Sequence, residues 1–431
     1  MDWLFYLQLA SLSIIVIYTI LVFRNIDPLV ATAIGVVLGF IFNWSSPIEM
    51  GKVLESALGS FLALVGFIIM LGRCLGEVLT ETKVSHTLVH KIVYGIGVNT
   101  QRRVKVGVVA SSLVIVAILG TLAGGLAILA PILRPIAASV GLSRPSLAVL
   151  MQAAGEEALI LGPFAPPVVA LLGVTGISYG TMLTHASLPI VMVTLITTWI
   201  MASRLQKQYH YEVFPHDASE ERFVPTKRQN LATVFFSLAF IACVAYGLIF
   251  QAKTSFVIFV MLFLAIATGL VGGLNLKRIF ELIVAGMQKN FYLFFIFLLL
   301  GPMLDLVQSA GGFAALMKVF VPLEQFGGKS LLTILIGLTG AFGMPAASAA
   351  VIKMLHEMFS PVAMEMSLSV TTFAFSMLLA TRITNFAIPG ANMFAAMGFA
   401  ESQNIKAMIK NGLTVTVVQI AFLVIYSLVW S

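Results

Sequence analysis

Residues 145–175 read PSLAVLMQAAGEEALILGPFAPPVVALLGVT. The stretch is apolar enough to cross a bilayer, because a spanning helix needs about 20 predominantly apolar residues. Two carboxylates, Glu156 and Glu157, lie near its middle, and a Gly/Pro cluster at 162–167 follows them. Because proline removes a helical hydrogen bond, the sequence predicts a transmembrane helix that breaks close to the membrane midplane. Irregular backbone at that depth persists only where protein buries it or where it lines a cavity.

The rest of the chain has the composition of a membrane protein. Of its 431 residues, 59% are apolar and only 10% are charged, and the mean hydropathy is +1.03. A soluble domain carries about 25% charged residues, so a water-exposed surface is excluded for most of this chain. Simple membrane spans are predicted at 3–23, 28–44, 58–79, 180–203, 231–250, 254–274, 290–309 and 411–430. We therefore expect an all-α, multi-pass protein of the cell inner membrane.

The two halves of the chain resemble each other. The stretches 104–142 and 331–362 are both too long for one span and carry small residues in the middle, and 367–398 is broken by Pro and Gly as 145–175 is. Three paired features recur at offsets of about 220 to 229 residues: Leu71-Gly72 with Leu300-Gly301, Gly120–Gly125 with Gly340–Pro345, and Gly162–Pro167 with Ile388–Gly390. This order predicts an N-terminal repeat (1–203), a hydrophilic cytoplasmic linker (204–229) and a C-terminal repeat (230–431).

The distribution of Lys and Arg predicts the topology. If 104–142 and 331–362 are re-entrant helical hairpins, each half has about five crossings, and the second half is inverted relative to the first. With both termini outside (periplasmic), 18 basic residues lie inside and five lie outside, namely Lys52, Lys253, Lys318, Lys329 and Lys353. This split follows the positive-inside rule, which favours hairpins over full crossings.

Charged residues inside the predicted spans mark the candidate site. Glu156 and Glu157 lie about 18 Å along the first broken helix, at 1.5 Å per residue. Arg382 occupies a similar position in the second broken helix, 226 residues after Glu156. A charge at the bilayer centre needs a partner or water. Two interpretations stay open: a structural Glu156–Arg382 ion pair between the halves, or an Arg382 that holds a substrate carboxylate while a glutamate takes up the coupling proton.

Further polar and small residues flank the predicted breaks. Uncharged hydroxyl and amide groups suit hydrogen bonds to a small ligand, and half-helix N-termini attract anions. The same residue types also occur as ordinary packing residues between membrane helices. The predicted substrate cradle consists of Arg382, Asn385, Thr384, Ser348, Thr121, Gly124, Gly343, Pro166 and Pro389, with the backbone of 120–125 and 343–348.

Four motifs give the chain a resemblance to a known family. They are Gly59-Ser60 through Leu71-Gly72-Arg73-Cys74-Leu75, the Gly-Pro-Phe-Ala-Pro-Pro run at 162–167, Tyr179-Gly180-Thr181, and Asn385-Phe-Ala-Ile-Pro-Gly390. In these the chain resembles the gluconate permease family of the ion transporter superfamily. The resemblance implies paired hairpins, a midplane site and proton symport of sugar acids. Glu157 and Pro163 stand about where that family tends to carry histidines, and related branches are sodium/proton antiporters and amino-acid carriers.

The combined expectation is a secondary transporter. The chain has no nucleotide-binding or nucleophile motif, so we expect no enzyme activity and no cofactor beyond a coupling H⁺ or Na⁺. The leading interpretation is ion-coupled symport of a small organic anion such as a sugar acid, with Glu156 and Glu157 as the ion-coupling groups. The alternatives are a sodium/proton antiporter, an amino-acid carrier and a channel. The expected partners are a small carboxylate, the lipid bilayer and a second copy in a homodimer, with no nucleic acid and no metal site.

Overall fold

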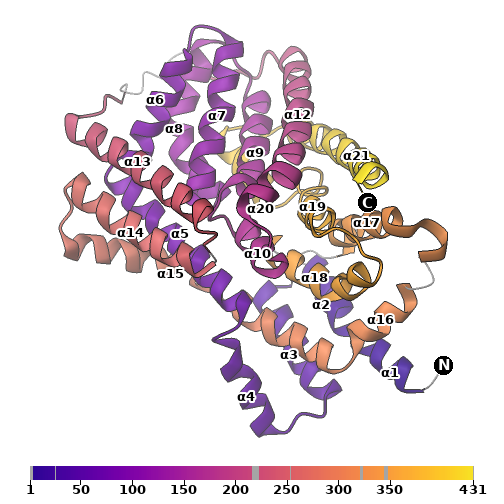
Figure 1. The fold of residues 1–431 in the computed structure, drawn as a ribbon. Helices are drawn as coiled ribbons and strands as arrows, with labels where there is room; N and C mark the ends of the chain where they lie inside the picture. The colour runs from indigo at the N-terminus through magenta and orange to yellow at the C-terminus, as the bar shows by residue number, and fades with distance from the viewer. Residues whose placement is uncertain are drawn as a thin grey trace.

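The computed structural model describes residues 3–24, 26–215, 223–252, 254–320, 324–343 and 348–430, and all regular elements in these ranges are helices (Figure 1). The first half comprises α1 (Trp3–Ser11), α2 (Ser13–Phe23), α3 (Pro28–Phe42), α4 (Pro47–Ala57), α5 (Phe61–Glu81), α6 (Val84–Ile96), α7 (Gln101–Leu119), α8 (Leu122–Ser139), α9 (Arg144–Leu161), α10 (Pro166–Thr175), α11 (Tyr179–Met182), the π-helical turn η1 (Leu183–Ser187) and α12 (Leu188–Gln208).

The second half of the chain is also helical in all its regular elements within the described ranges. It comprises α13 (Lys227–Ile249), α14 (Thr254–Gly272), α15 (Leu276–Ser309), α16 (Gly312–Phe320), α17 (Glu324–Gly343, kinked at Gly328), α18 (Ser348–Glu365), α19 (Val370–Ala380), α20 (Ala391–Phe399) and α21 (Ile405–Trp430). The tip between α17 and α18, residues 344–347 of the predicted cradle, lies outside the described residues.

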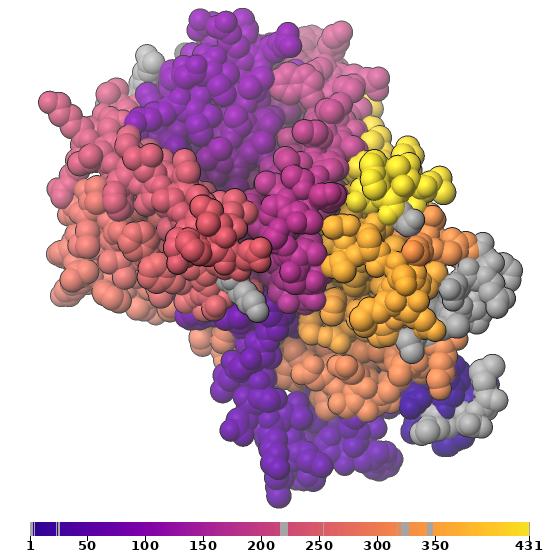
Figure 2. Space-filling model, viewed as in Figure 1, coloured from indigo at the N-terminus to yellow at the C-terminus, as the bar shows by residue number. Residues whose placement is uncertain are grey.

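The chain is a polytopic all-α membrane protein. Within the described residues, nine helical segments are long and apolar enough to span a bilayer. Large apolar side chains face outward along them, such as Leu238 and Ile241 on α13 and Phe259 on α14. Figure 2 shows α13 and α14 covering one flank of the molecule, while α4 protrudes at the lower end. Exposed apolar surface on this scale indicates contact with lipid.

Proline and capping residues set where several helices begin. Asp27 accepts hydrogen bonds from the backbone N–H groups of Leu29 and Val30, and α3 then starts at Pro28. The helices α9 and α10 also carry proline at their first positions, where the missing N–H costs nothing. One predicted span was too short: 290–309 is the second part of α15, a continuous helix that already begins at Leu276.

The stretch 104–142 forms a hairpin, as predicted. Helices α7 and α8 contact each other along their lengths, and the chain reverses at Gly120, whose φ of 65° lies in the left-handed region that favours glycine. The Gln101 side chain at the start of α7 donates to the Val140 and Gly141 carbonyl oxygens just after α8. Both ends of the hairpin therefore lie at the same face of the molecule.

The two hairpins open toward opposite faces. Near the start of α21, Glu401 pairs with Arg134 of α8 at 2.9 Å, which places the open end of the first hairpin there. Near the end of α21, the Ser427 carbonyl oxygen accepts a hydrogen bond from Ser330, at the beginning of the straight part of α17. Because α21 is about 39 Å long at 1.5 Å per residue, these two contacts lie at opposite ends of the fold. This is the arrangement that an inverted repeat requires.

The stretches 145–175 and 367–398 are both interrupted, as predicted, but the second break is longer than predicted. The first spans Gly162 to Ala165 between α9 and α10. The second begins at Thr381, eight residues before the Pro389-Gly390 pair that signalled it, and continues as a series of i→i−3 turns such as Asn385 N–H to the Arg382 carbonyl oxygen at 3.1 Å. Arg382 therefore lies in irregular backbone and not on a helix.

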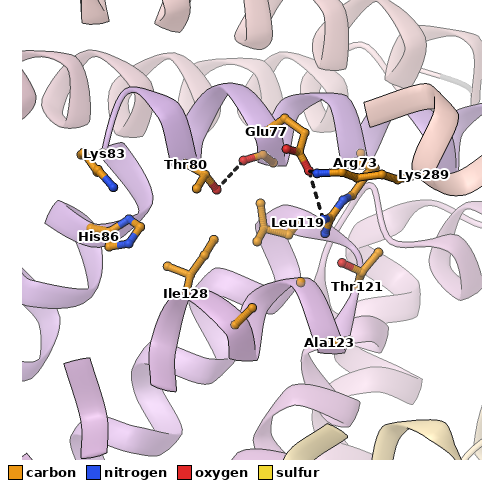
Figure 3. Close-up of a pocket in the computed structure, with 14 residues that line it drawn as sticks. Arg73, Glu77, Thr80, Lys83, His86, Leu119, Thr121, Ala123, Ile128 and Lys289 are labelled. Carbon is orange, nitrogen blue, oxygen red and sulfur yellow. Dashed lines mark hydrogen bonds and ion pairs between the residues drawn. The ribbon is translucent and has the colours of Figure 1, made fainter. Parts of the chain in front are cut away.

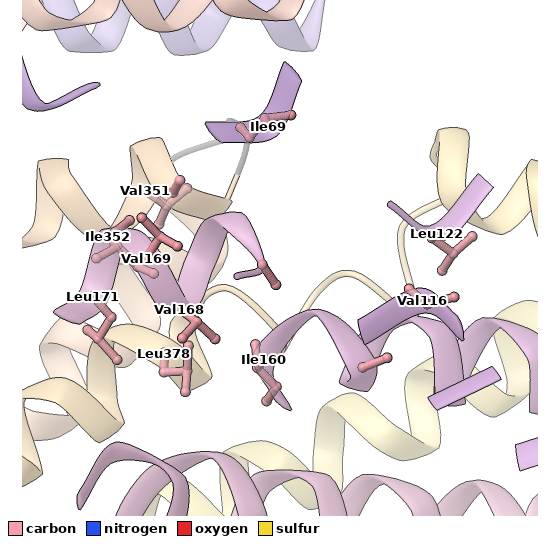
Figure 4. Close-up of a cluster of buried hydrophobic side chains, with 14 of the residues drawn as sticks. Ile69, Val116, Leu122, Ile160, Val168, Val169, Leu171, Val351, Ile352 and Leu378 are labelled. Atoms are coloured by element: carbon pink, nitrogen blue, oxygen red, sulfur yellow. The ribbon is translucent and has the colours of Figure 1, made fainter. Parts of the chain in front are cut away.

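One apolar core joins the two halves. Figure 4 shows Val168, Val169 and Leu171 of α10 beside Val351 and Ile352 of α18, with Leu378 of α19 next to them. The half-helix after the first break thus packs on the second hairpin. The contact between α8 and α20 is its counterpart in the other direction. Each hairpin is held by the broken helix of the opposite half.

Helix α21 approaches the second break so closely that only glycine fits at position 412. A Cβ atom on Gly412 would lie 1.8 Å from the Phe386 carbonyl oxygen. We expect Gly412→Ala to destabilise the protein by about 1–3 kcal/mol, since neither backbone can move without displacing the other. A thermal unfolding curve in detergent measures the effect. Gly398→Ala on α20, where a Cβ would meet nothing within 4 Å, is the matched control and should unfold like the native protein. Equal unfolding temperatures for both variants would contradict this packing.

Candidate functional site

The buried ion pair between Glu156 and Arg382 lies where the two broken helices meet. Arg382 Nη1 donates to Glu156 Oε2 at 2.9 Å and to the Glu156 backbone carbonyl oxygen at 3.1 Å. The Arg382 and Glu156 side chains are 0% and 1% exposed. The pair therefore links the end region of α9 to the second break across the interface of the two halves. The repeat offset of 226 residues anticipated this contact.

Asparagines complete the hydrogen bonding of Glu156. Asn392 Nδ2, in the first turn of α20, donates to Oε1 at 2.7 Å, and Asn385 Nδ2 donates more weakly to Oε2 at 3.4 Å. The carboxylate of Glu156 accepts from an amide at one oxygen and from a guanidinium and an amide at the other. Buried charge is tolerated only when it is satisfied in this way.

The guanidinium of Arg382 is also hydrogen-bonded at each of its nitrogens. Its Nη2 donates to Ser348 Oγ at the start of α18, and its Nε donates to Thr381 Oγ1 at 3.1 Å. The fork of nitrogens that would hold a carboxylate bidentately is thus already engaged by Glu156 and Ser348. Of the two interpretations raised by the sequence, this geometry favours the structural ion pair.

The predicted cradle residues divide into separate places. Arg382 and Asn385 donate to Glu156, and Ser348 accepts from Arg382. Thr384 instead donates to the Ala341 carbonyl oxygen of α17 at 2.9 Å. Thr121 and Gly124 lie beside Arg73 in a different cavity, near the tip of the first hairpin. The remaining members frame the breaks: Pro166 begins α10, Gly343 ends α17 and Pro389 precedes α20. A substrate-binding role for the set stays a prediction.

Glu157 differs sharply from its neighbour Glu156. It is also fully buried, but neither carboxylate oxygen has a hydrogen-bond partner among the described residues. The Thr194 hydroxyl of α12 faces it. That hydroxyl donates to the Ile190 carbonyl oxygen at 3.0 Å and accepts from Gln419 Nε2 at 2.8 Å, so its single proton is already used. Glu157 is therefore an uncompensated buried carboxylate.

Other unused oxygens accompany Glu157 on the helices that pack around it. Helices α12 and α21 both contact α9. On these three helices, buried oxygen atoms without a hydrogen-bond partner in the described ranges belong to Gln152, Thr198, Asn411 and Gln419. Unsatisfied buried polar atoms are rare in proteins and demand an explanation, such as a ligand or an ion.

The sequence reasoning missed these partners. Gln152, Thr194 and Gln419 are single polar residues in apolar helices, a pattern that membrane proteins also use for ordinary helix packing. A usable signal existed in the repeat, since Thr194 and Gln419 are 225 residues apart, within one residue of the offset that relates Glu156 to Arg382. Their hydrogen bond joins α12 to its counterpart α21.

The ion pair should dominate the stability of this region. We expect Glu156→Gln to lower the stability of the fold by roughly 3–5 kcal/mol, because it removes the carboxylate that is hydrogen-bonded to the buried Arg382 guanidinium. Thermal unfolding in detergent measures the loss. Adding Arg382→Met to the same chain should restore much of it, since the guanidinium charge that lost its hydrogen-bonded partner is then removed. A double variant no more stable than Glu156→Gln alone would contradict the pairing.

Comparison with known proteins links part of the chain to a transporter family. Residues 1–202 match the Na⁺/H⁺ antiporter family. The matched segment includes Glu156, Glu157 and Thr194 but ends before Arg382 and Gln419. A search of curated proteins finds no match to the chain.

This match corrects two predictions from the sequence. The chain is similar to a cation/proton antiporter family and not to the gluconate permeases, so the predicted family resemblance was wrong. The main functional interpretation, symport of a small organic anion, was wrong for the same reason, and the alternative of sodium/proton antiport is better supported. The misleading signal was the pair of Gly/Pro-broken stretches, which does not by itself distinguish an anion symporter from a cation antiporter.

Proposed function

We propose that the protein exchanges Na⁺ for H⁺ across the membrane and that Glu157 is the carboxylate both ions use. The observation that carries the proposal is a fully buried carboxylate whose two oxygens have no hydrogen-bond partner among the described residues, beside a second carboxylate that is hydrogen-bonded at both oxygens. The match of residues 1–202 to the Na⁺/H⁺ antiporter family supports the identity of the ions.

Charge balance distinguishes the roles of the two glutamates. Glu156 and Arg382 neutralise each other, so ionised Glu157 leaves one net negative charge in the buried cluster. An uncompensated charge at this depth costs several kcal/mol. Either a proton or a sodium ion removes that charge, and neither leaves room for the other on the same oxygens. Glu157 is therefore suited to binding the two ions in alternation.

The same balance couples the two fluxes. A transporter that changes conformation with Glu157 bare would have to carry an unpaired charge through an apolar interior, whereas the protonated and the Na⁺-loaded forms are both neutral. Only the loaded forms reorient readily, so each inward movement of one ion requires outward movement of the other. Exchange follows without any separate coupling device.

The neighbouring oxygens fit a hard monovalent cation. Carboxylate, amide and hydroxyl oxygens are the ligands that such ions prefer in proteins. Beside Glu157, the chain offers the Thr194 hydroxyl and the side-chain carbonyl oxygen of Gln419, which no described residue uses. We assign these as the first additional ligands. The Lys and Arg split further supports a cell-membrane orientation with both termini outside.

Neutralising Glu157 should abolish exchange. In proteoliposomes with an internal pH dye, a Na⁺ gradient should drive proton movement through the native protein. The Glu157→Gln variant should show no such movement, because glutamine has no carboxylate that can bind H⁺ and Na⁺ in turn. Glu55→Gln, on the exposed helix α4, removes the same charge far from the cluster and should leave exchange unchanged. Full Na⁺-driven proton flux through Glu157→Gln would exclude Glu157 as the shared carboxylate.

Competition for one carboxylate also dictates a pH dependence. As the pH falls, protons occupy Glu157 and the apparent affinity for Na⁺ should weaken, toward a tenfold loss per pH unit once the carboxyl group is mostly protonated. The half-saturating Na⁺ concentration at several pH values measures this. Gln419→Ala should raise that concentration at high pH without removing proton competition. An apparent Na⁺ affinity that is independent of pH would mean that the two ions use different groups.

A further inference from the structure

A second polar region lies apart from the glutamate cluster, in a cavity of about 460 Å³ between α5, α6, the tip of the first hairpin and α15 (Figure 3). Figure 3 shows Arg73 and Lys289 reaching the Glu77 carboxylate from one side, with Thr121 below them and Lys83 and His86 at the other end. Neither the family match nor the proposed exchange assigns a role to this cavity.

The cavity carries an excess of positive charge. Arg73, Lys83 and Lys289 line it, against the single carboxylate of Glu77. That carboxylate is shared, with Glu77 Oε1 3.0 Å from Arg73 Nη2 and 2.7 Å from Lys289 Nζ. Two net positive charges therefore remain. A vestibule for Na⁺ would be expected to carry the opposite sign.

The N-terminus of α8 adds to this positive potential. The first N–H groups of a helix lack intrahelical partners and form its positive end. Thr121, the N-cap residue, makes no capping hydrogen bond, and its hydroxyl has no partner among the described residues. Ala123 and Gly124, in the first turn of α8, line the cavity.

The guanidinium of Arg73 is pressed against this helix end. A Cβ atom on Gly124 would lie 2.7 Å from Arg73 Nη1, and Arg73 Nε has no hydrogen-bond partner in the described part of the chain. A cation at the positive end of a helix is unfavourable, because like charges repel there. Glu77 offsets only part of this charge repulsion, since its carboxylate also pairs with Lys289. An anion bound at this point would balance the remaining positive charge.

His86 contributes a neutral hydrogen-bonding ring. Burial, together with the nearby charge of Lys83, lowers the pKa of His86 to about 4, so its imidazole is uncharged at pH 7. A ring nitrogen of neutral imidazole can donate a hydrogen bond to an oxyanion.

We propose that this cavity binds the phosphate group of a phosphomonoester, of inorganic phosphate or of an anionic lipid headgroup, held by Arg73, Lys289 and the N-terminus of α8, with Lys83 adding positive charge from the other end. A tetrahedral oxyanion presents four oxygens, which suits the several hydrogen-bond donors that line the cavity. Its charge of up to two balances the excess in the cavity. The anion is resident and not transported, and it ties the hairpin tip to α5 and α15.

The first test measures binding of inorganic phosphate to the full-length protein, purified in an uncharged detergent without phosphate. Phosphate should raise the unfolding temperature saturably, compared with chloride at the same ionic strength. The double variant Lys83→Gln/Lys289→Gln should weaken the half-saturating concentration at least tenfold. Lys91→Gln/Lys277→Gln, which removes the same charge from exposed positions on α6 and α15, is the matched control and should bind like the native protein.

A second arm distinguishes the source of the phosphate group. In lipid nanodiscs, phosphatidylglycerol should stabilise the native protein relative to phosphatidylcholine if a headgroup occupies the cavity, and the Lys83/Lys289 double variant should lose that difference. Stabilisation by soluble phosphate alone identifies a free oxyanion. Equal responses of the two double variants to both ligands, or no response of the native protein to either, would overturn the proposal. Glu157→Gln should keep its phosphate response, so failure of the exchange mechanism and failure of this site are separately visible.

Discussion

The contact between Glu156 and Arg382 is the constraint on which the centre of this protein depends. Each residue lies in one of two interrupted helices from opposite repeats, and neither could be buried alone, because an unpaired charge at this depth is too costly. Their pairing fixes where the break after α9 meets the break after α19. Asn392 and Ser348 then take the remaining hydrogen-bonding positions, so α20 and α18 are drawn to the same point. The ion pair thus organises the irregular backbone around it.

The pairing of Glu156 with Arg382 determines the environment of the next residue, Glu157. Because Arg382 is spent on Glu156, Glu157 has no countercharge of its own, although the two glutamates are consecutive in the chain. On a helix, consecutive residues point about 100° apart, so Glu156 faces the second break while Glu157 faces α12 and α21. The difference between the paired carboxylate of Glu156 and the unpartnered carboxylate of Glu157 therefore comes from helical geometry and not from residue type.

More of the fold than of the candidate site could be predicted from the sequence. Hydropathy, the Gly-rich turn at 120–125 and the excess of inside Lys and Arg were sufficient for the first hairpin and the broken helices, because these features follow from membrane solvation. The repeat offset even placed Arg382 opposite Glu156. The extent of the second break was not predictable, since the turns from Thr381 onward contain no Pro or Gly until Pro389. The substrate class also failed, because the same broken helices serve anions and cations.

The two hairpins pack against the two helix breaks that surround the buried glutamates. Gly162, in the first break, leaves room for the Ala117 carbonyl oxygen of α7, to which a Cβ atom would come within 2.4 Å. In the second repeat, a Cβ atom on Gly340 of α17 would lie 2.7 Å from the Cβ of Ala380, where α19 ends. Each break therefore packs closely against the hairpin of its own half, and the two hairpins open toward opposite faces. Displacing one hairpin would expose the buried glutamates to one face while the other face stays closed, and the proposed exchange would need two such states.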